Sequence, residues 1–496
     1  MKFNFVGHKF NFFNAKGQRI KGSNKFSLVR NFAPLTLCPL ALNLFVPFAL
    51  LVLSISSQSL AQTHRVVRVT DANAVNPGEC SVAINPKNPD NIIGVSFQYG
   101  RPGQPRVNNV RYVSNDGGKT WTTIIAQNSR GLTQGDDQIS ISGEGFAYHS
   151  YISFEGIRVA RPLKAISGIW ISASRDEGKN WAEPIPVVDH INSVTPFEDK
   201  PAIVTDNVLG SPYKNYLYVA WTRFDVYGSA APEDHSNIFF SASPDGGKTF
   251  AMPFRVSDMP GDCRDDDNTL EGAMPAIGPK GEVYLIWAGP QGLYFDKSLD
   301  GGVTFGKDKV IMNTPGGWDT KIPGINRSNG MPITKVDTSN GKNRGTIYIN
   351  WIDARNGDHD VFLMASRDGG NSWSEAIRVN DDKLKNKKDQ FFSWMAVDPI
   401  DGSVNVIFYD RRDHGGTKTG VTLARSIDGG KTFTNHKINL EPFECNPSVF
   451  FGDYSGIDAY GGRVVPIFTH FTNKTELAIS AAIFDFKLNS QEAVVR

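Results

Sequence analysis

Beyond residue 62, the chain alternates short apolar runs with clusters of Gly, Pro, Asn and Asp. Two apolar runs split by such a cluster predict a strand–turn–strand unit. No stretch of this region shows the period of a long helix. Seven units recur along the chain, at residues 80–97, 137–154, 200–222, 273–289, 331–355, 392–412 and 454–471.

In six units, a further predicted strand leads into the same eight-residue turn, found at 114–121, 174–181, 243–250, 298–305, 366–373 and 426–433. The shared letters are Ser-x-Asp-x-Gly, followed by a small polar residue and Trp or Phe. An Asp in such a turn accepts hydrogen bonds from its own backbone, and Gly supplies a positive φ. We therefore expect a structural role for Asp116, Asp176, Asp245, Asp300, Asp368 and Asp428.

A fourth strand leaves each turn, and four antiparallel strands per unit are typical of a β-propeller blade. The last unit has a third strand at 476–486, after which the chain nearly ends. Residues 64–84 parallel residues 184–203, so the strand just after residue 62 is predicted to complete the last blade. That pairing removes two open sheet edges. The sequence predicts an all-β, seven-bladed propeller; a six-bladed alternative has to leave out one strand pair.

The first 61 residues differ from the rest. A basic lead without acidic residues precedes an apolar run over residues 33–55, and small residues follow at Ser59 and Ala61. This pattern predicts a signal peptide over 1–61 and a propeller domain over 62–496. The expected location is secreted, periplasmic or at the cell surface, with no membrane association after cleavage. An uncleaved membrane anchor is the alternative.

Charge and cysteine content narrow the possible partners. Lys plus Arg total 52 and Asp plus Glu 51, which gives no sign of nucleic-acid binding, and we expect a monomer. Cys80, Cys263 and Cys445 form neither a disulfide framework nor a zinc-binding spacing. Because the connections into blades one and seven adjoin across the ring closure, a Cys80–Cys445 disulfide is a hypothesis.

The repeated turns join strands three and four, so they predict which rim of the propeller carries a site. First strands start, and second strands end, on the opposite rim, where loops of several blades converge. Both sets of positions are rich in polar residues. First-strand starts offer Glu79, Asp136, Asp137, Glu198, Asp199, Lys200, Glu271, Gln390 and Asp453. Second-strand ends offer Tyr99, Arg101, Glu155, Arg223, Asp225, Asp353, Arg355, Tyr409, Asp410, Arg411, Arg412 and His470.

The repeated turn is similar to the Asp-box, or BNR repeat, and residues 63–486 resemble Asp-box propellers of the sialidase superfamily. That resemblance implies three arginines that hold a sugar carboxylate, a Tyr nucleophile activated by Glu, and an Asp acid/base. The chain lacks the Phe/Tyr-Arg-Ile-Pro motif that carries the first arginine of retaining sialidases, and those enzymes have six blades. The superfamily also contains other glycosidases, polysaccharide lyases and binding proteins.

Candidate site residues follow from the rim and from the resemblance. Arginine forks bind carboxylates, so Arg223, Arg355, Arg411 and Arg412 are predicted to bind an acidic sugar. A Tyr nucleophile needs a nearby acid, and either Tyr409 or Tyr454 fits this requirement. The predicted catalytic residues are Tyr409, Asp410, Glu271 and Asp137.

We therefore expect a secreted, sialidase-like glycoside hydrolase of the exo-α-sialidase type, with a glycan or glycoconjugate of acidic character as its partner. The alternatives are a non-catalytic propeller that binds a glycan or protein, and a polysaccharide lyase using His149 or His470. No cofactor and no metal are expected, although the acidic stretch 262–268 has the oxygen ligands that Ca²⁺ prefers.

Overall fold

The computed structural model describes residues 63–100, 107–128, 131–155, 166–191 and 196–488. The predicted signal peptide, residues 1–61, lies outside the described residues. Among these residues, all regular secondary structure consists of β-strands. The described part of the chain holds no helix with the length and apolar character needed to span a bilayer.

Seven antiparallel sheets of four ordered strands form the blades. Blade 1 contains β2 (Gly78–Ile84), β3 (Ile92–Tyr99), β4 (Val107–Ser114) and β5 (Thr122–Ile125); blade 2 contains β6 (Thr133–Ile141), β7 (Ala147–Glu155), β8 (Ile166–Ser174) and β9 (Ile185–Ile191). Blade 3 contains β10 (Phe197–Thr205), β11 (Leu217–Phe224), β12 (Ser236–Ser243) and β13 (Phe254–Arg255); blade 4 contains β14 (Glu271–Ile277), β15 (Val283–Gly289), β16 (Gly292–Ser298) and β17 (Lys309–Met312).

Blade 5 contains β20 (Ile333–Val336), β21 (Ile347–Asp353), β22 (Asp360–Ser366) and β23 (Ile377–Arg378). Blade 6 contains β24 (Gln390–Val397), β25 (Val404–Asp410), β26 (Lys418–Ser426) and β27 (Thr434–Lys437), and β28 (Phe443–Glu444) adds to β26. Blade 7 contains β29 (Gly456–Tyr460), β30 (Arg463–Phe471), β31 (Leu477–Asp485) and, from the other end of the chain, β1 (His64–Arg68).

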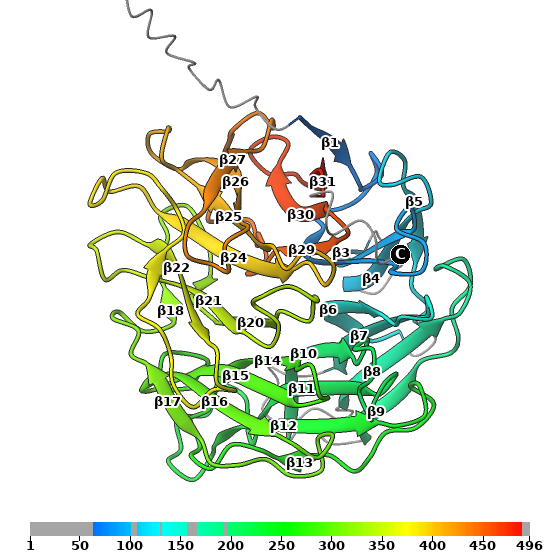
Figure 1. The fold of residues 1–496 in the computed structure, drawn as a ribbon. Helices are drawn as coiled ribbons and strands as arrows, with labels where there is room; N and C mark the ends of the chain where they lie inside the picture. Colours follow the sequence, from blue (N-terminus) through cyan, green and yellow to red (C-terminus); the bar gives the residue numbers. More distant parts are fainter. Residues whose placement is uncertain (1–62, 101–106, 129–130, 156–165, 192–195, 489–496) are drawn as a thin grey trace, which may run out of the picture. The chain divides into compact units, whose positions relative to one another are not determined.

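The first strand of each blade is the innermost one. Each inner strand contacts the inner strands of its neighbours, in the order β29, β2, β6, β10, β14, β20, β24 and back to β29. The blades therefore surround a common axis as a closed ring (Figure 1). Large apolar side chains between neighbouring sheets, such as Tyr218, Trp287 and Trp351, are fully buried and form the core.

The ring closes through pairing of the two ends of the described chain. β1 pairs antiparallel with β31, in a register that runs from His64 opposite Phe484 to Arg68 opposite Ser480. In Figure 1 the blue β1 lies beside the red β31. The seven-bladed prediction and the predicted closure by the strand after residue 62 are both confirmed.

All six repeated turns share one hydrogen-bond pattern, shown here for Asp300. Its Oδ1 accepts from the backbone N of Thr304 at 2.9 Å and from Ser298 Oγ at 2.7 Å, while its Oδ2 accepts from Thr304 Oγ1 at 2.6 Å. Ser298 Oγ in turn accepts from the backbone N of Gly302, whose φ is +83°. Despite partial burial, these donors lower the pKa of Asp300 to about 2. The carboxylate is thus fully used in holding the turn.

We expect Asp300→Ala to lower the free energy of unfolding by about 1 kcal/mol, as loss of a similar side-chain cap does. Because the folded-state pKa lies below the unfolded value, the carboxylate stabilises the fold above pH 4, and this contribution fades as the pH falls toward 2. Urea unfolding at pH 7 and pH 3 measures the difference. Leu299→Ser, an exposed change in the same turn, is the control; an equal effect of both variants would contradict the assignment.

We also expect a chain that begins at Asp71, and so lacks β1, to be less stable than one that begins at Thr63. The deletion exposes the hydrogen-bonding edge of β31 and uncovers Phe484, on which the ring of His64 stacks at 4.4 Å. The expected loss is ~2–4 kcal/mol, with concentration-dependent association through the open edge. Thermal unfolding and light scattering measure both. Equal stability of the two chains would show that closure of the ring is dispensable.

Candidate functional site

A β-bulge interrupts the start of five inner strands. In each, one extra residue has a positive φ: Glu79, Asp136, Lys200, Gly272 and Phe392. Such bulges redirect side chains and often lie beside functional sites. The left-handed conformation costs of order 1 kcal/mol for residues other than Gly, so surrounding contacts must hold it in place.

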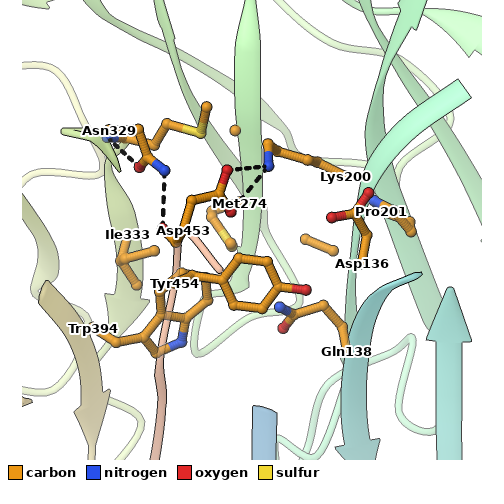
Figure 2. A pocket seen from close by; sticks show the side chains of 13 residues that line it. Asp136, Gln138, Lys200, Pro201, Met274, Asn329, Ile333, Trp394, Asp453 and Tyr454 are labelled. Atoms are coloured by element: carbon orange, nitrogen blue, oxygen red, sulfur yellow. Dashed lines mark hydrogen bonds and ion pairs between the residues drawn. The ribbon is translucent and has the colours of Figure 1, made fainter. Parts of the chain in front are cut away.

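These inner strands surround a pocket on the rim opposite the Asp-box turns. The blade 2 and blade 3 bulges place Asp136 and Lys200 at its polar side, and the inner strands of blades 4 to 6 supply an apolar side with Met274, Ile333 and Trp394. In Figure 2, Asp136 and Gln138 lie across the pocket from Ile333 and Trp394, with Tyr454 between them. The pocket and the open solvent at its mouth together amount to about 410 Å³ of space not filled by protein atoms. Its wall is completed by Pro201, Ala202, Gly272, Asn329, Met331 and Asp453.

A two-stranded ribbon inserted between blades 4 and 5 brings further groups to the pocket. It consists of β18 (Asp319–Thr320) and β19 (Ser328–Asn329). Asn329 Nδ2 donates to the backbone carbonyl of Asp453 at 2.9 Å, and Arg327 Nε donates to the Asp453 carboxylate, also at 2.9 Å. Trp318 Nε1 anchors the ribbon on the Thr269 carbonyl at 3.2 Å. The insertion therefore forms one wall of the pocket.

Asp453 is the centre of the charged groups. Lys200 Nζ lies 3.0 Å from its Oδ2, and Arg327 donates to the same oxygen through Nε and Nη2. Burial alone would raise the pKa of Asp453, but the charges of Arg327 and Lys200 outweigh it and hold that pKa well below its usual value. Asp453 is consequently ionised at neutral pH.

Two further acids lie behind the carboxylates that face the pocket. Glu79 shares a side-chain hydrogen bond with Asp453, and burial together with the charge of Asp453 raises the pKa of Glu79. Asp199 shares a side-chain hydrogen bond with Asp136, and burial together with the charge of Asp136 raises the pKa of Asp199. The site thus holds two hydrogen-bonded pairs of side-chain carboxyl groups, Glu79 with Asp453 and Asp199 with Asp136.

Tyr454 lines the pocket with its hydroxyl group. The residue is 9% exposed, and among the described residues its hydroxyl has no hydrogen-bond partner. Burial and the nearby charge of Glu79 raise its pKa well above the usual value. Tyr454 therefore stays protonated, and its buried hydroxyl has a hydrogen to donate that no described residue accepts.

Glu271 is the predicted catalytic residue that the structure places beside the charged groups of the pocket, Lys200, Arg327 and Asp453. It begins β14 and is fully buried, and Lys200 Nζ lies 4.0 Å from its Oε1. Neither carboxyl oxygen has a hydrogen-bond partner among the residues described. Burial and the charge of Asp265 raise its pKa well above the usual value.

Asp137 lies beneath the pocket, next to the bulge residue Asp136. Its Oδ1 is 2.6 Å from Nε2 of the fully buried His149, and His149 Nδ1 accepts from Arg111 Nε at 3.1 Å. Burial raises the pKa of Asp137 and lowers that of His149. This chain of side chains supports the blade 2 bulge, and it keeps His149 away from the pocket.

Tyr409 and Asp410 lie in blade 6, outside the residues that line the pocket. Tyr409 is 1% exposed and stacks on Phe391 at 5.3 Å, and its hydroxyl donates to the Thr469 carbonyl at 2.7 Å. Asp410 accepts from Thr422 Oγ1 at 2.7 Å and pairs with Arg412 Nε at 2.5 Å. Of the two Tyr candidates, the one that reaches the pocket is Tyr454.

The structure does not bring the four predicted arginines together, because they belong to blades 3, 5 and 6. Arg223 pairs with Glu198 at 2.7 Å, and Arg355 pairs with Asp353 at 2.6 Å. Arg412 pairs with Asp410 and Asp381. Arg411 donates to Thr419 Oγ1 at 3.0 Å and to the Pro323 carbonyl at 2.8 Å. Each guanidinium is therefore engaged near its own blade.

The acidic stretch 262–268 uses its carboxylates within the protein. Asp265 accepts from the Tyr227 hydroxyl at 2.6 Å and pairs with Arg327 at 3.3 Å, and Asp267 accepts from the backbone N of Asp319 at 2.7 Å. The described residues contain no group of three or more His, Cys, Asp or Glu side chains arranged to hold a metal ion. A Ca²⁺ ion at this stretch stays a sequence prediction.

The hypothesis of a Cys80–Cys445 disulfide is wrong, because both residues are free, buried thiols. Cys445 Sγ lies 3.4 Å from Thr419 Oγ1, in blade 6. Cys80 follows the bulge residue Glu79 in blade 1, and burial raises its pKa to about 12. Each thiol is thus packed separately within its own surroundings.

Comparison with known protein families identifies the repeated turn. The family model described as BNR/Asp-box repeat matches residues 112–123, which include the first repeated turn, and the predicted Asp-box propeller is confirmed. None of the curated proteins matches the chain.

Similar solved structures include a protein of unknown function from Dyadobacter fermentans DSM 18053, with 13% identity and a TM-score of 0.48 over 86% of this chain and 99% of that one. The NanB sialidase of Streptococcus pneumoniae has 12% identity and a TM-score of 0.46 over 86% and 98%. An alpha-L-arabinanase of Penicillium chrysogenum has 13% identity and a TM-score of 0.45 over 73% and 98%. The two named activities are those of glycoside hydrolases, and likeness at this level assigns neither to this chain.

We expect Glu271→Gln to gain stability relative to the wild type as the pH rises. A raised carboxyl pKa means that the folded state holds a proton which the unfolded state has already lost, so the wild type loses stability above the unfolded value of about 4.5. The difference in free energy of unfolding between the variant and the wild type should change by up to about 1.4 kcal/mol per pH unit. Urea unfolding between pH 5 and pH 8 measures it, with the exposed Glu233→Gln as control. A stability difference between Glu271→Gln and the wild type that does not vary with pH would refute a raised pKa for Glu271.

Proposed function

We propose that the chain is a glycoside hydrolase whose acid–base residues are Asp136 and Asp453, in the pocket at the axis of the propeller. The observation that carries the proposal is the placement of Asp136 and Asp453 in one pocket, each hydrogen-bonded to a second buried acid, Asp199 or Glu79. Glycosidases use two carboxyl groups that flank the bond to be cleaved, and environments that separate their pKa values assign the roles.

The two carboxylates receive different roles from their surroundings. Asp453 is held ionised by Lys200 and Arg327, which suits a group that stabilises positive charge at the anomeric carbon. Asp136 lacks such direct ion pairs among the described residues and is hydrogen-bonded to Asp199, whose pKa is raised by burial and by the charge of Asp136. In this proposal the hydrogen-bonded pair of Asp136 and Asp199 supplies the proton to the leaving oxygen.

Tyr454 takes part as a neutral hydrogen-bond donor in this proposal. A Tyr nucleophile requires a lowered barrier to loss of its proton, whereas burial and the charge of Glu79 raise the pKa of Tyr454. The apolar side of the pocket, with Met274 and Trp394, supplies a surface for the non-polar face of a sugar ring.

The finer prediction, an exo-α-sialidase acting on acidic glycans, remains a candidate within this proposal. The lyase alternative gains no support from the buried His149 or from His470, which is 9% exposed and whose pKa burial lowers to about 4. The basic and apolar character of residues 1–61 supports action outside the cytoplasm, on a glycan or glycoconjugate.

The test is to incubate residues 62–496 with a panel of glycosides and polysaccharides that includes sialosides and uronates. We expect release of free sugar, and a loss of about 100-fold or more in kcat for Asp136→Asn and Asp453→Asn. Asp300→Asn, in an Asp-box turn on the opposite rim, is the matched control and should keep full activity. An unsaturated product would indicate a lyase, and the absence of any product across the panel would favour a binding protein.

A further inference from the structure

Acidic groups outnumber basic groups around the central pocket. Among the described residues, the cations that interact with this cluster are Lys200 and Arg327. Six acids interact electrostatically with these two cations or with one another. They are Glu79, Asp136, Asp199, Asp265, Glu271 and Asp453. A ligand that enters the pocket therefore meets an excess of carboxyl groups.

Both cations are already bound by these acids. Lys200 Nζ lies 3.0 Å and 3.3 Å from the two oxygens of Asp453, and 4.0 Å from Glu271. Arg327 donates to Asp453 through Nε and Nη2, and to Asp265 through Nη1 at 3.3 Å. The carboxylate of an acidic sugar would have to displace a carboxylate of the protein in order to gain a cation. The arginines of blades 3, 5 and 6 are engaged elsewhere, as described above.

Groups that suit an uncharged ligand are present at the pocket. Tyr454 lines it, the Tyr454 hydroxyl has no partner among the described residues, and the residue is 91% buried. The carboxylate of Asp136 and the amide of Gln138 lie near that hydroxyl (Figure 2). Opposite them, Ile333 and Trp394 form the apolar side. A sugar ring matches these two sides of the pocket, because it has polar hydroxyl groups on its edge and apolar C–H groups on its face.

We infer that the pocket selects an uncharged sugar residue and discriminates against sugars that carry a carboxylate. The inference rests on the proposed function for the identity of the ligand as a sugar, and it narrows the substrate to neutral glycans. The discrimination comes from repulsion by the ionised Asp453 and from the lack, among the described residues, of a cation at the pocket that is not already paired. Both act on binding before any chemical step.

Binding of matched pairs tests the inference. The probes are 4-nitrophenyl glycosides of glucose, galactose and mannose, each paired with the corresponding uronide, together with lactose and its sialylated form. Saturation-transfer NMR and calorimetry give the affinities. We expect the neutral member of the pair that fits the pocket to bind at least about tenfold more tightly than its charged counterpart. Added salt should weaken this preference, because it screens the repulsion.

A charge variant checks that the pocket itself is responsible. Asp136→Asn removes a carboxyl group from the pocket wall and should reduce the preference for the neutral sugar severalfold, whereas Asp300→Asn on the opposite rim should leave it unchanged. Heat denaturation of each variant confirms that it folds.

The outcomes separate this inference from the proposed function. Neutral sugars that bind without being hydrolysed would support the inference and overturn the proposed function. Uronides or sialosides that bind as well as, or better than, their neutral partners and are hydrolysed would overturn the inference and leave the proposed function in place. If no sugar of the panel binds, both are overturned.

Discussion

The pairing of β1 with β31 is the constraint on which the rest of this fold depends. Without a fourth strand the last blade would expose the hydrogen-bonding edge of β31, and here a strand from the beginning of the described chain covers that edge. Closure places β29 beside β2, so that Glu79 of blade 1 meets Asp453 at the entry to blade 7. The central pocket therefore consists of groups that lie up to several hundred residues apart in the sequence.

Bulges on the inner strands decide what that pocket contains. In blades 1, 2 and 3 the left-handed bulge residue is charged, whereas in blade 4 it is Gly272 and in blade 6 it is Phe392. A side chain at Gly272 would collide with Met331, since a Cβ there would lie 2.8 Å from the Met331 sulfur. One half of the pocket is consequently charged and the other half apolar, although all blades have the same architecture.

Buried charges of this kind are expensive for stability. Removing ions from water costs several kcal/mol each, and their mutual attraction offsets this cost only with close pairing and hydrogen bonds. Asp453 is well compensated by Lys200 and Arg327, whereas Glu271 has Lys200 at 4.0 Å and a weaker interaction with Arg327, and burial raises its pKa. Concentrated, unevenly compensated charge at a convergent opening is the physical pattern of a functional site rather than of a structural core.

The sequence alone determined the architecture. Strand periodicity and six copies of a turn with local hydrogen bonds are short-range features, so the number of blades, the closing strand and the structural role of the Asp-box carboxylates followed from them. The rim of the site also followed, because strand direction is fixed once the turns are assigned. Glu271 and Tyr454 were recognised among the rim residues for the same reason.

Only the tertiary structure decided which rim residues meet. Arg327 and Asn329 stand on an insertion without counterparts in the repeat, and nothing in their sequence neighbourhood points to Asp453. Lys200, Glu79 and Asp136 belonged to the candidate positions, but their direction depends on bulges that a one-residue register shift creates. The conspicuous arginines of blades 3, 5 and 6 found acids close by instead. Local patterns specify elements and turns, whereas the direction and charge state of a side chain depend on neighbours that only the closed ring brings together.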